Sequence, residues 1–251
     1  MRWRLAGALT AGMLGLAGCG ERQSAGAPAE RAPAPLSAWP QGRAAPMKIT
    51  DDLTLAVPLA YQRSAIERQP PAPGDRPGGA GPPGAAHGEV HFDFFLPGFT
   101  GYTLDNYRND ADLNKVEVVY LHAGDPHEAD PDAPGEYPPN MLKRGLRELL
   151  DPQHAVAQYG LRCYRGRVLT NRLTCFGRRD AHSGEDIMLT TLLPPYPADV
   201  SFPMFQVRYF SRRYGGVRLE WRAHVSQLPR WLEIDTQVWR FIDAWRQPRG
   251  N

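Results

Sequence analysis

The chain has 251 residues, of which 42% are hydrophobic and 22% are charged. There are 29 lysines and arginines against 27 aspartates and glutamates, so the formal net charge at pH 7 is only +2. A chain this close to neutrality has no electrostatic footprint for nucleic acid, and nucleic acid is therefore excluded as a partner.

The first 18 residues have the layout of an export signal. Arg2 and Arg4 provide a basic start, residues 5–17 are free of charge, and small residues close the run. The apolar run is shorter than the ~20 residues that a membrane-spanning helix needs. The segment therefore predicts export and cleavage, and not a permanent membrane span.

Leu16-Ala17-Gly18-Cys19 resembles the lipobox of bacterial lipoproteins. The resemblance implies that residues 1–18 are a lipoprotein signal peptide and that Cys19 becomes the lipidated first residue. A thioether-linked diacylglycerol, often with a third chain such as palmitate on the amine, would hold the protein firmly in a membrane. Gly20 follows instead of Asp, which implies the outer membrane, facing the periplasm. A chance cysteine in an ordinary signal peptide is the alternative.

Low-complexity stretches divide the rest of the chain. Residues 19–46 are rich in Ala, Pro and Gly, which predicts a disordered tether. Alternating apolar residues predict a first strand within 47–66, and Pro and Gly pairs predict a disordered loop over 67–88. A globular domain is expected over 89–247.

Without Arg2 and Arg4, the mature chain has 27 basic and 27 acidic residues and is formally neutral.

The globular domain is predicted to contain consecutive strands with helices packed on one face. The expected strands are 89–96, 116–121, 160–164, 173–176, 186–193, 204–210 and 217–225. A short mid-chain helix is expected over 141–150, and Gly215-Gly216 predicts a hairpin turn. This order indicates an α+β fold with an antiparallel sheet.

The C-terminal segment 229–246 is predicted to be an amphipathic helix that packs on the sheet. Its apolar residues recur at steps of three and four, and Ser226 and Pro229 suit its N-terminus. Four charged residues are expected to point away from the apolar stripe: Arg230, Asp235, Arg240 and Asp243.

Cys163 and Cys175 are predicted to form a structural disulfide. They flank a hairpin, and two cysteines close together in an oxidising compartment usually pair. Redox or metal-binding use is the alternative, but the sequence has no C-x-x-C motif and no matching ligand cluster.

Neither a metal site nor a catalytic site is assigned. The run Asp125–Asp132 holds four acids and a histidine, which could surround a cation, but it lacks the EF-hand spacing and contains two prolines typical of a solvated loop. G-x-S-x-G and H-E-x-x-H are absent, the histidines are scattered, and Ser211 has no adjacent base. We therefore expect no enzymatic activity and no cofactor, although triads can assemble from distant residues.

Arginines and aromatic residues alternate between Met204 and Trp221. On paired strands they could form a cationic aromatic face for a protein partner. The candidate interface residues are Arg208, Arg212, Arg213, Tyr214, Arg218 and Trp221. The alternative is that alternate residues fill the core while the arginines face water.

Two runs in the same region, Tyr209–Arg222 and Trp239–Trp245, are similar to lipoproteins encoded beside type VI secretion effectors. The similarity is to immunity proteins that protect the envelope from phospholipase toxins, and it covers residues 92–246. It implies a periplasmic binding protein that neutralises a lipase effector. A structural or assembly lipoprotein of the outer membrane, without catalytic activity, is the alternative.

Overall fold

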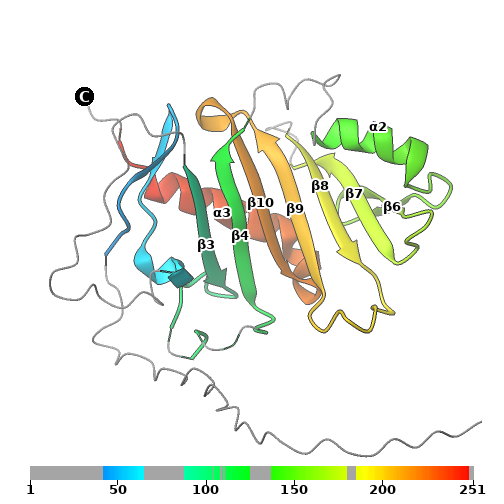
Figure 1. The fold of residues 1–251 in the computed structure, drawn as a ribbon, viewed down its shortest axis with the longest axis horizontal. Helices are drawn as coiled ribbons and strands as arrows, with labels where there is room; N and C mark the ends of the chain where they lie inside the picture. Colours follow the sequence, from blue (N-terminus) through cyan, green and yellow to red (C-terminus); the bar gives the residue numbers. More distant parts are fainter. Residues whose placement is uncertain are drawn as a thin grey trace, which may run out of the picture. The chain divides into compact units, whose positions relative to one another are not determined.

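An eight-stranded antiparallel sheet is the centre of the fold (Figure 1). The computed structural model describes residues 42–64, 88–103, 105–107, 109, 111–124, 137–179 and 185–248, all of which lie in one compact unit. The signal peptide, Cys19, most of the tether, the loop 65–87 and the acidic run 125–132 lie outside the described residues. Among the residues described, no helix is long and apolar enough to cross a membrane.

The strands of this sheet follow a simple order, β3-β4-β10-β9-β8-β7-β6-β5, and every neighbouring pair is antiparallel. Their bounds are β3 Glu89–Phe95, β4 Lys115–Ala123, β5 Val156–Gln158, β6 Leu161–Arg165, β7 Arg172–Arg178, β8 Asp186–Leu192, β9 Met204–Ser211 and β10 Val217–His224. The chain therefore runs as a meander from β5 to β10, and the hairpin β3–β4 joins the sheet beside β10.

Two helices pack on opposite faces of the sheet. Figure 1 shows α3 (Trp231–Trp245) crossing one face of the sheet, while α2 (Pro138–Glu148) contacts β7 and β8. On β8, Ile187 and Leu189 belong to the large core under α3, whereas Met188 belongs to a small cluster under α2. This alternation follows from the two-residue period of a strand. The structure thus has the predicted α+β class, with the C-terminal helix on an antiparallel sheet. The expectation that the helices share one face is wrong, because the opposite face has a small apolar cluster of its own, which α2 covers.

The segment predicted as one first strand contains two short strands instead. β1 (Met47–Thr50) and β2 (Leu53–Leu55) form a separate two-stranded sheet, because the chain turns at Asp51-Asp52, and a 3-10 turn (Leu59–Tyr61) follows. Leu53 and Leu55 are buried in the large core. The backbone N–H of Ala56 donates to the carbonyl of Trp245, which joins this segment to the end of α3.

The C-terminal helix begins two residues later than predicted. Residues Val225–Arg230 form a 3-10 helix that contains Pro229, and α3 starts at Trp231. Ser226 does not cap α3; its backbone N–H donates to the side chain of His224, which caps the 3-10 helix instead. The sequence also gave no indication of β5, because all three of its residues are exposed and show no alternation of burial.

Candidate binding surface

The six residues predicted as an interface lie in three different places. Strand alternation directs Arg208 and Arg218 to the face of the sheet opposite α3, which we call the open face. Trp221 points the other way and is completely buried against α3, so the prediction that it contacts a partner is wrong. Arg212, Arg213 and Tyr214 lie in the turn between β9 and β10.

Trp221 instead belongs to a buried polar cluster around Asp235 of α3. The carboxylate accepts hydrogen bonds from Trp221 Nε1 at 2.9 Å, from the hydroxyl of Tyr209 at 2.8 Å and from Arg179 Nε. Trp239 Nε1 donates in turn to the Tyr209 oxygen at 2.6 Å. The expectation that Asp235 points away from the apolar stripe is therefore wrong, because Tyr209 of β9, Trp221 of β10 and Arg179, directly after β7, satisfy it inside the core.

Burial raises the pKa of the Asp235 carboxyl, although the positive charge of Arg179 and the three hydrogen bonds oppose this shift. Burial likewise raises the pKa of Tyr209 well above its usual value. Every oxygen of the Asp235 carboxylate has a partner, and the side chain is fully buried. The cluster connects α3 to the sheet, and of the members named here only Arg179 is partly exposed, with 12% of its side chain accessible.

The residues of the turn between β9 and β10 mainly contact α3 of the same molecule. Arg213 Nη2 lies 2.7 Å from a carboxylate oxygen of Asp243 on α3, and the hydroxyl of Tyr214 donates to the same oxygen. The Arg213 guanidinium also lies 4.3 Å from the ring centroid of Trp239. Tyr214 adopts a positive φ of 53°, and Gly215 and Gly216 follow with positive φ as well, as the tight hairpin requires. These contacts hold the turn against α3.

The part of the open face formed by β3, β4 and β10 carries an exposed aromatic patch with one arginine, bordered by Glu89, which lies 2.8 Å from His91. Tyr120 is 41% exposed, and its ring lies 5.9 Å from that of His91 and 6.4 Å from that of His122. Arg218 is the cross-strand partner of His122 on β10. We call these four residues the β4 patch. Of them only Arg218 was predicted. Strict alternation along 116–122 would put Tyr120 and His122 on the same face as the buried Val116 and Val118, but a register shift between Val118 and Tyr120 turns them to the open face.

Ion pairs border the β4 patch on the same face. Glu117 accepts from Lys115 Nζ at 2.8 Å and from Arg222 Nε across the β4–β10 pair. Burial by itself would raise the pKa of Glu117, but the hydrogen bonds and charges of Lys115 and Arg222 outweigh it and lower the pKa below its usual value.

A cavity of about 370 Å³ lies between α2, the sheet and the β6–β7 loop. Its lining is mostly apolar and includes Leu149, Leu150, Phe176, Met188 and Leu169, with Arg208 at its edge. The predicted interface residue Arg208 thus belongs to this cavity and not to the β4 patch. Its Nη2 lies 3.5 Å from the sulfur of Met141 on α2.

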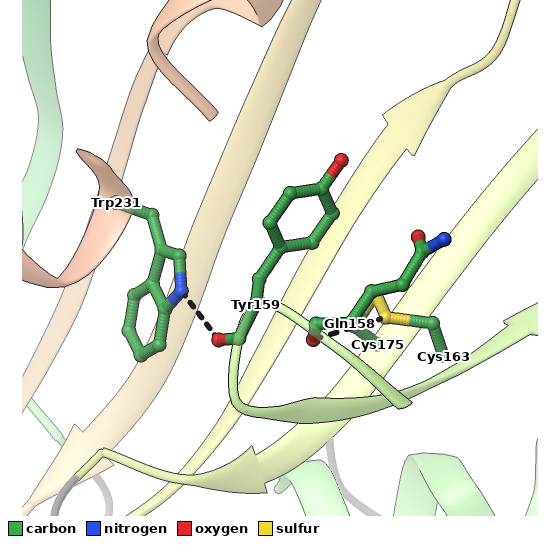
Figure 2. The surroundings of a disulfide bond; sticks show 5 residues. All are labelled: Gln158, Tyr159, Cys163, Cys175 and Trp231. Atoms are coloured by element: carbon green, nitrogen blue, oxygen red, sulfur yellow. Dashed lines mark hydrogen bonds between the residues drawn. A yellow bond between two sulfur atoms is a disulfide. The ribbon is translucent and has the colours of Figure 1, made fainter. Parts of the chain in front are cut away.

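Cys163 and Cys175 form a disulfide, as the sequence predicts. They are cross-strand partners on β6 and β7, and both are fully buried on the α3 side of the sheet. Figure 2 shows Trp231 Nε1 donating to the carbonyl of Tyr159 in the neighbouring turn, at 2.8 Å. The disulfide joins β6 to β7, and the hydrogen bond connects the β5–β6 turn to the start of α3.

Other chemistry-bearing residues are separate from these surfaces. Ser211 is fully buried, and its hydroxyl donates to Glu185, a carboxyl whose pKa burial raises. Within the described ranges no group of three His, Cys, Asp or Glu side chains could hold a metal ion. No described residue is therefore assigned a catalytic or metal-binding role.

The sequence matches no protein-family model, and comparison with curated proteins gives no significant match. Among solved structures, the chain is similar to an immunity protein of the Stenotrophomonas maltophilia type IV secretion system. The identity is 14%, the TM-score is 0.47, and the match covers 82% of this chain and 95% of that one. At such an identity a related architecture does not imply a related activity.

Proposed function

We propose that this protein is a lipid-anchored envelope lipoprotein that binds a protein partner in the periplasm, as an immunity protein against a type VI secretion phospholipase effector. The lipobox ending in Cys19 supports the anchor, and the similarity of residues 92–246 to lipase-immunity lipoproteins supports the class of partner. The anchor would hold the domain at the outer membrane, where an incoming lipase would act.

The observation that carries the binding role is the β4 patch. Tyr and Arg are enriched at the centres of protein interfaces, because they bury a large area and still make hydrogen bonds. Here an exposed tyrosine lies near the rings of two histidines, and Arg218 is the cross-strand partner of one of them, His122, at the β3 end of the sheet. A rigid sheet loses little conformational entropy on binding, which favours affinity.

The anchor is tested by Cys19→Ala. The variant should move from the membrane fraction to the soluble periplasmic fraction, because lipidation needs the thiol. A Cys19→Ala protein that stays in the membrane fraction would contradict the lipid anchor and leave the binding role to be judged separately.

The binding role is tested by co-expressing the chain with the product of the adjacent open reading frame, directed to the periplasm. The wild type should restore growth and bind that product. The double variant Tyr120→Ala, Arg218→Glu should lose protection and bind at least about tenfold more weakly, as expected for an interface centre. Its matched control is Leu232→Ala, Arg240→Glu, which changes an exposed apolar residue and an exposed arginine on α3.

Two results would contradict the proposal at different levels. Full protection by the Tyr120, Arg218 variant would place the contact elsewhere on the domain. Absence of both binding and protection by the wild type would overturn the immunity role, and capture of an outer-membrane assembly component would then favour the assembly lipoprotein.

A further inference from the structure

The cavity under α2 has a strongly apolar end between the helix and the sheet. Helix α2 packs loosely on the sheet: of its residues, only Pro138 and Gly145 are fully buried. The absence of a side chain on Gly145 lets Leu150 fold back under the helix, because a Cβ at this position would lie 2.7 Å from Leu150 Cδ1. A cavity of about 370 Å³ therefore remains between the helix and the sheet.

Arg167 fixes the opposite wall. Its guanidinium donates to the backbone carbonyls of Leu150 at 2.7 Å and Leu146 at 2.9 Å, at the C-terminal end of α2. The next two residues, Val168 and Leu169, line the cavity and are 84% and 57% exposed. The β6–β7 loop is thus held beside the helix with its apolar side chains at the mouth of the cavity.

The cavity continues along the sheet into a second hollow of about 300 Å³ with a different lining. The two share Leu169, Arg172 and Thr190, so together they form one groove. The second hollow adds Gln206 of β9 and Arg222 of β10. Along its length the groove therefore becomes more polar, with Gln206 and Arg222 beside the apolar side chains Leu192, Met204 and Phe205.

The charge around the groove is strongly one-sided. In the described parts of the chain, no acidic residue lines either hollow, whereas Arg172 lines both. Arg208 and Arg222 from the neighbouring strands add to this charge, and Glu117 offsets Arg222 through an ion pair. The described lining of the groove thus carries positive charge and no negative charge, which favours an anionic ligand.

We propose that this groove binds an anionic amphiphile with a single alkyl chain. The alkyl chain lies in the apolar end under α2, and the headgroup lies against Arg172 and Arg208 where the groove turns polar. The space is sufficient, because an apolar cavity of about 150 Å³ already binds benzene. Free fatty acids and lysophospholipids share this chemistry, one with a carboxylate and the other with a phosphate. This site is separate from the β4 patch and does not depend on the proposed immunity role.

The test is a calorimetric titration of the full chain carrying Cys19→Ala, so that no acyl group of its own competes. The probes are dodecanoate and dodecyl phosphate below the concentrations at which they form micelles, with dodecyltrimethylammonium as the cationic counterpart. At least one anion should bind, and the cation should bind about tenfold more weakly or not at all. Comparison of the two anions distinguishes a carboxylate headgroup from a phosphate.

Three variants locate the site. Thr190→Trp places an indole where the two hollows meet and should weaken anion binding at least about tenfold. Arg172→Glu and Arg208→Glu should each weaken it by about tenfold, because each replaces a charge-assisted contact with repulsion. Arg172 is exposed, so its variant should fold even if Thr190→Trp does not. Arg240→Glu on α3, which lines neither hollow, is the charge-matched control and should bind like the parent.

The proposal is overturned if the parent binds neither anion, or if all three groove variants bind as it does. Binding to vesicles of phosphatidylglycerol without binding to the monomeric anions would instead identify a membrane contact. If no anion binds but Arg172→Glu abolishes binding of the adjacent gene's product, the groove is part of a protein interface. Because the titration contains no protein partner, its outcome is distinct from that of the growth assay.

Discussion

The two faces of the eight-stranded sheet use the same strands for different purposes. Toward α3, alternate residues such as Leu219 and Trp221 form one continuous core, and the polar group buried there, Asp235, has a hydrogen bond or ion pair on each oxygen. On the open face, the intervening residues Arg218 and Arg222 lie among ion pairs, exposed aromatic rings and the groove beside α2. Consecutive residues of one strand thus face either the core or the open face. Substitutions toward the core should mainly lower stability, and substitutions in the β4 patch or the groove should mainly weaken binding.

The largest effect is expected on the α3 face, from Asp235→Ala. The substitution leaves Arg179 without its buried carboxylate, and Tyr209 and Trp221 without an acceptor. Breaking a buried charge pair in this way should lower the free energy of unfolding by about 3–5 kcal/mol. The measurement is urea unfolding followed by tryptophan fluorescence.

The matched control is Asp243→Ala, on the same helix but 44% exposed. It should cost at most about 1 kcal/mol, as exposed ion pairs do. Equal losses of unfolding free energy for the two variants would show that the buried Asp235 cluster stabilises the fold no more than an exposed ion pair does.

The second effect concerns the disulfide, which also lies on the α3 side. Its cysteines are 12 residues apart, and in the chain-entropy model such a bridge stabilises the fold by about 3 kcal/mol. The double variant Cys163→Ala, Cys175→Ala should show this loss in thermal or urea unfolding. Thr174→Ala, on the opposite face of the same strand β7, should lose less than about 1 kcal/mol. A larger loss of stability from Thr174→Ala than from the double cysteine variant would show that the open face of β7 contributes more to stability than the α3 side, and would contradict this prediction.

The smallest effect is expected on the open face, from Glu117→Gln. The pKa of Glu117 is lowered in the folded protein, so its ionised form stabilises the fold above the unfolded-state pKa of about 4.3, and this contribution is lost as the pH falls through the folded pKa. Glu117→Gln should therefore be less stable than the wild type by about 1 kcal/mol at pH 7, with a smaller difference near pH 3. Urea unfolding at a series of pH values measures it, and a difference that grows toward low pH would contradict the assigned ion pairs.

Much of the fold could be predicted because local patterns agreed with the tertiary structure. Each of the predicted strands from Glu89 onward corresponds to a strand of the sheet, and the helix after β10 has the expected apolar stripe. The helical period already places Asp235 on the apolar stripe, four residues after Trp231 and three before Val238. Its direction was mispredicted because a carboxylate was expected to face water, and the partners that satisfy it are 14, 26 and 56 residues away in sequence. Trp221 is different. It alternates with Arg218, Glu220 and Arg222 along β10 as a core residue does, so the sequence already contained the signal for its burial. This signal favours the alternative given for the region, in which alternate residues fill the core and the arginines face water.

The sequence by itself determined the class of fold, the type of each long element and the cysteine pair, because burial periodicity and turn residues act over a few neighbouring positions. The lipobox at Cys19 is likewise a local motif, and the proposed anchor rests on it alone. Only the tertiary structure decided that β4 lies beside β10, that α2 and α3 cover opposite faces, and that Arg172 and Arg208 meet at one groove. These arrangements depend on contacts between residues far apart in the chain, which no local pattern specifies.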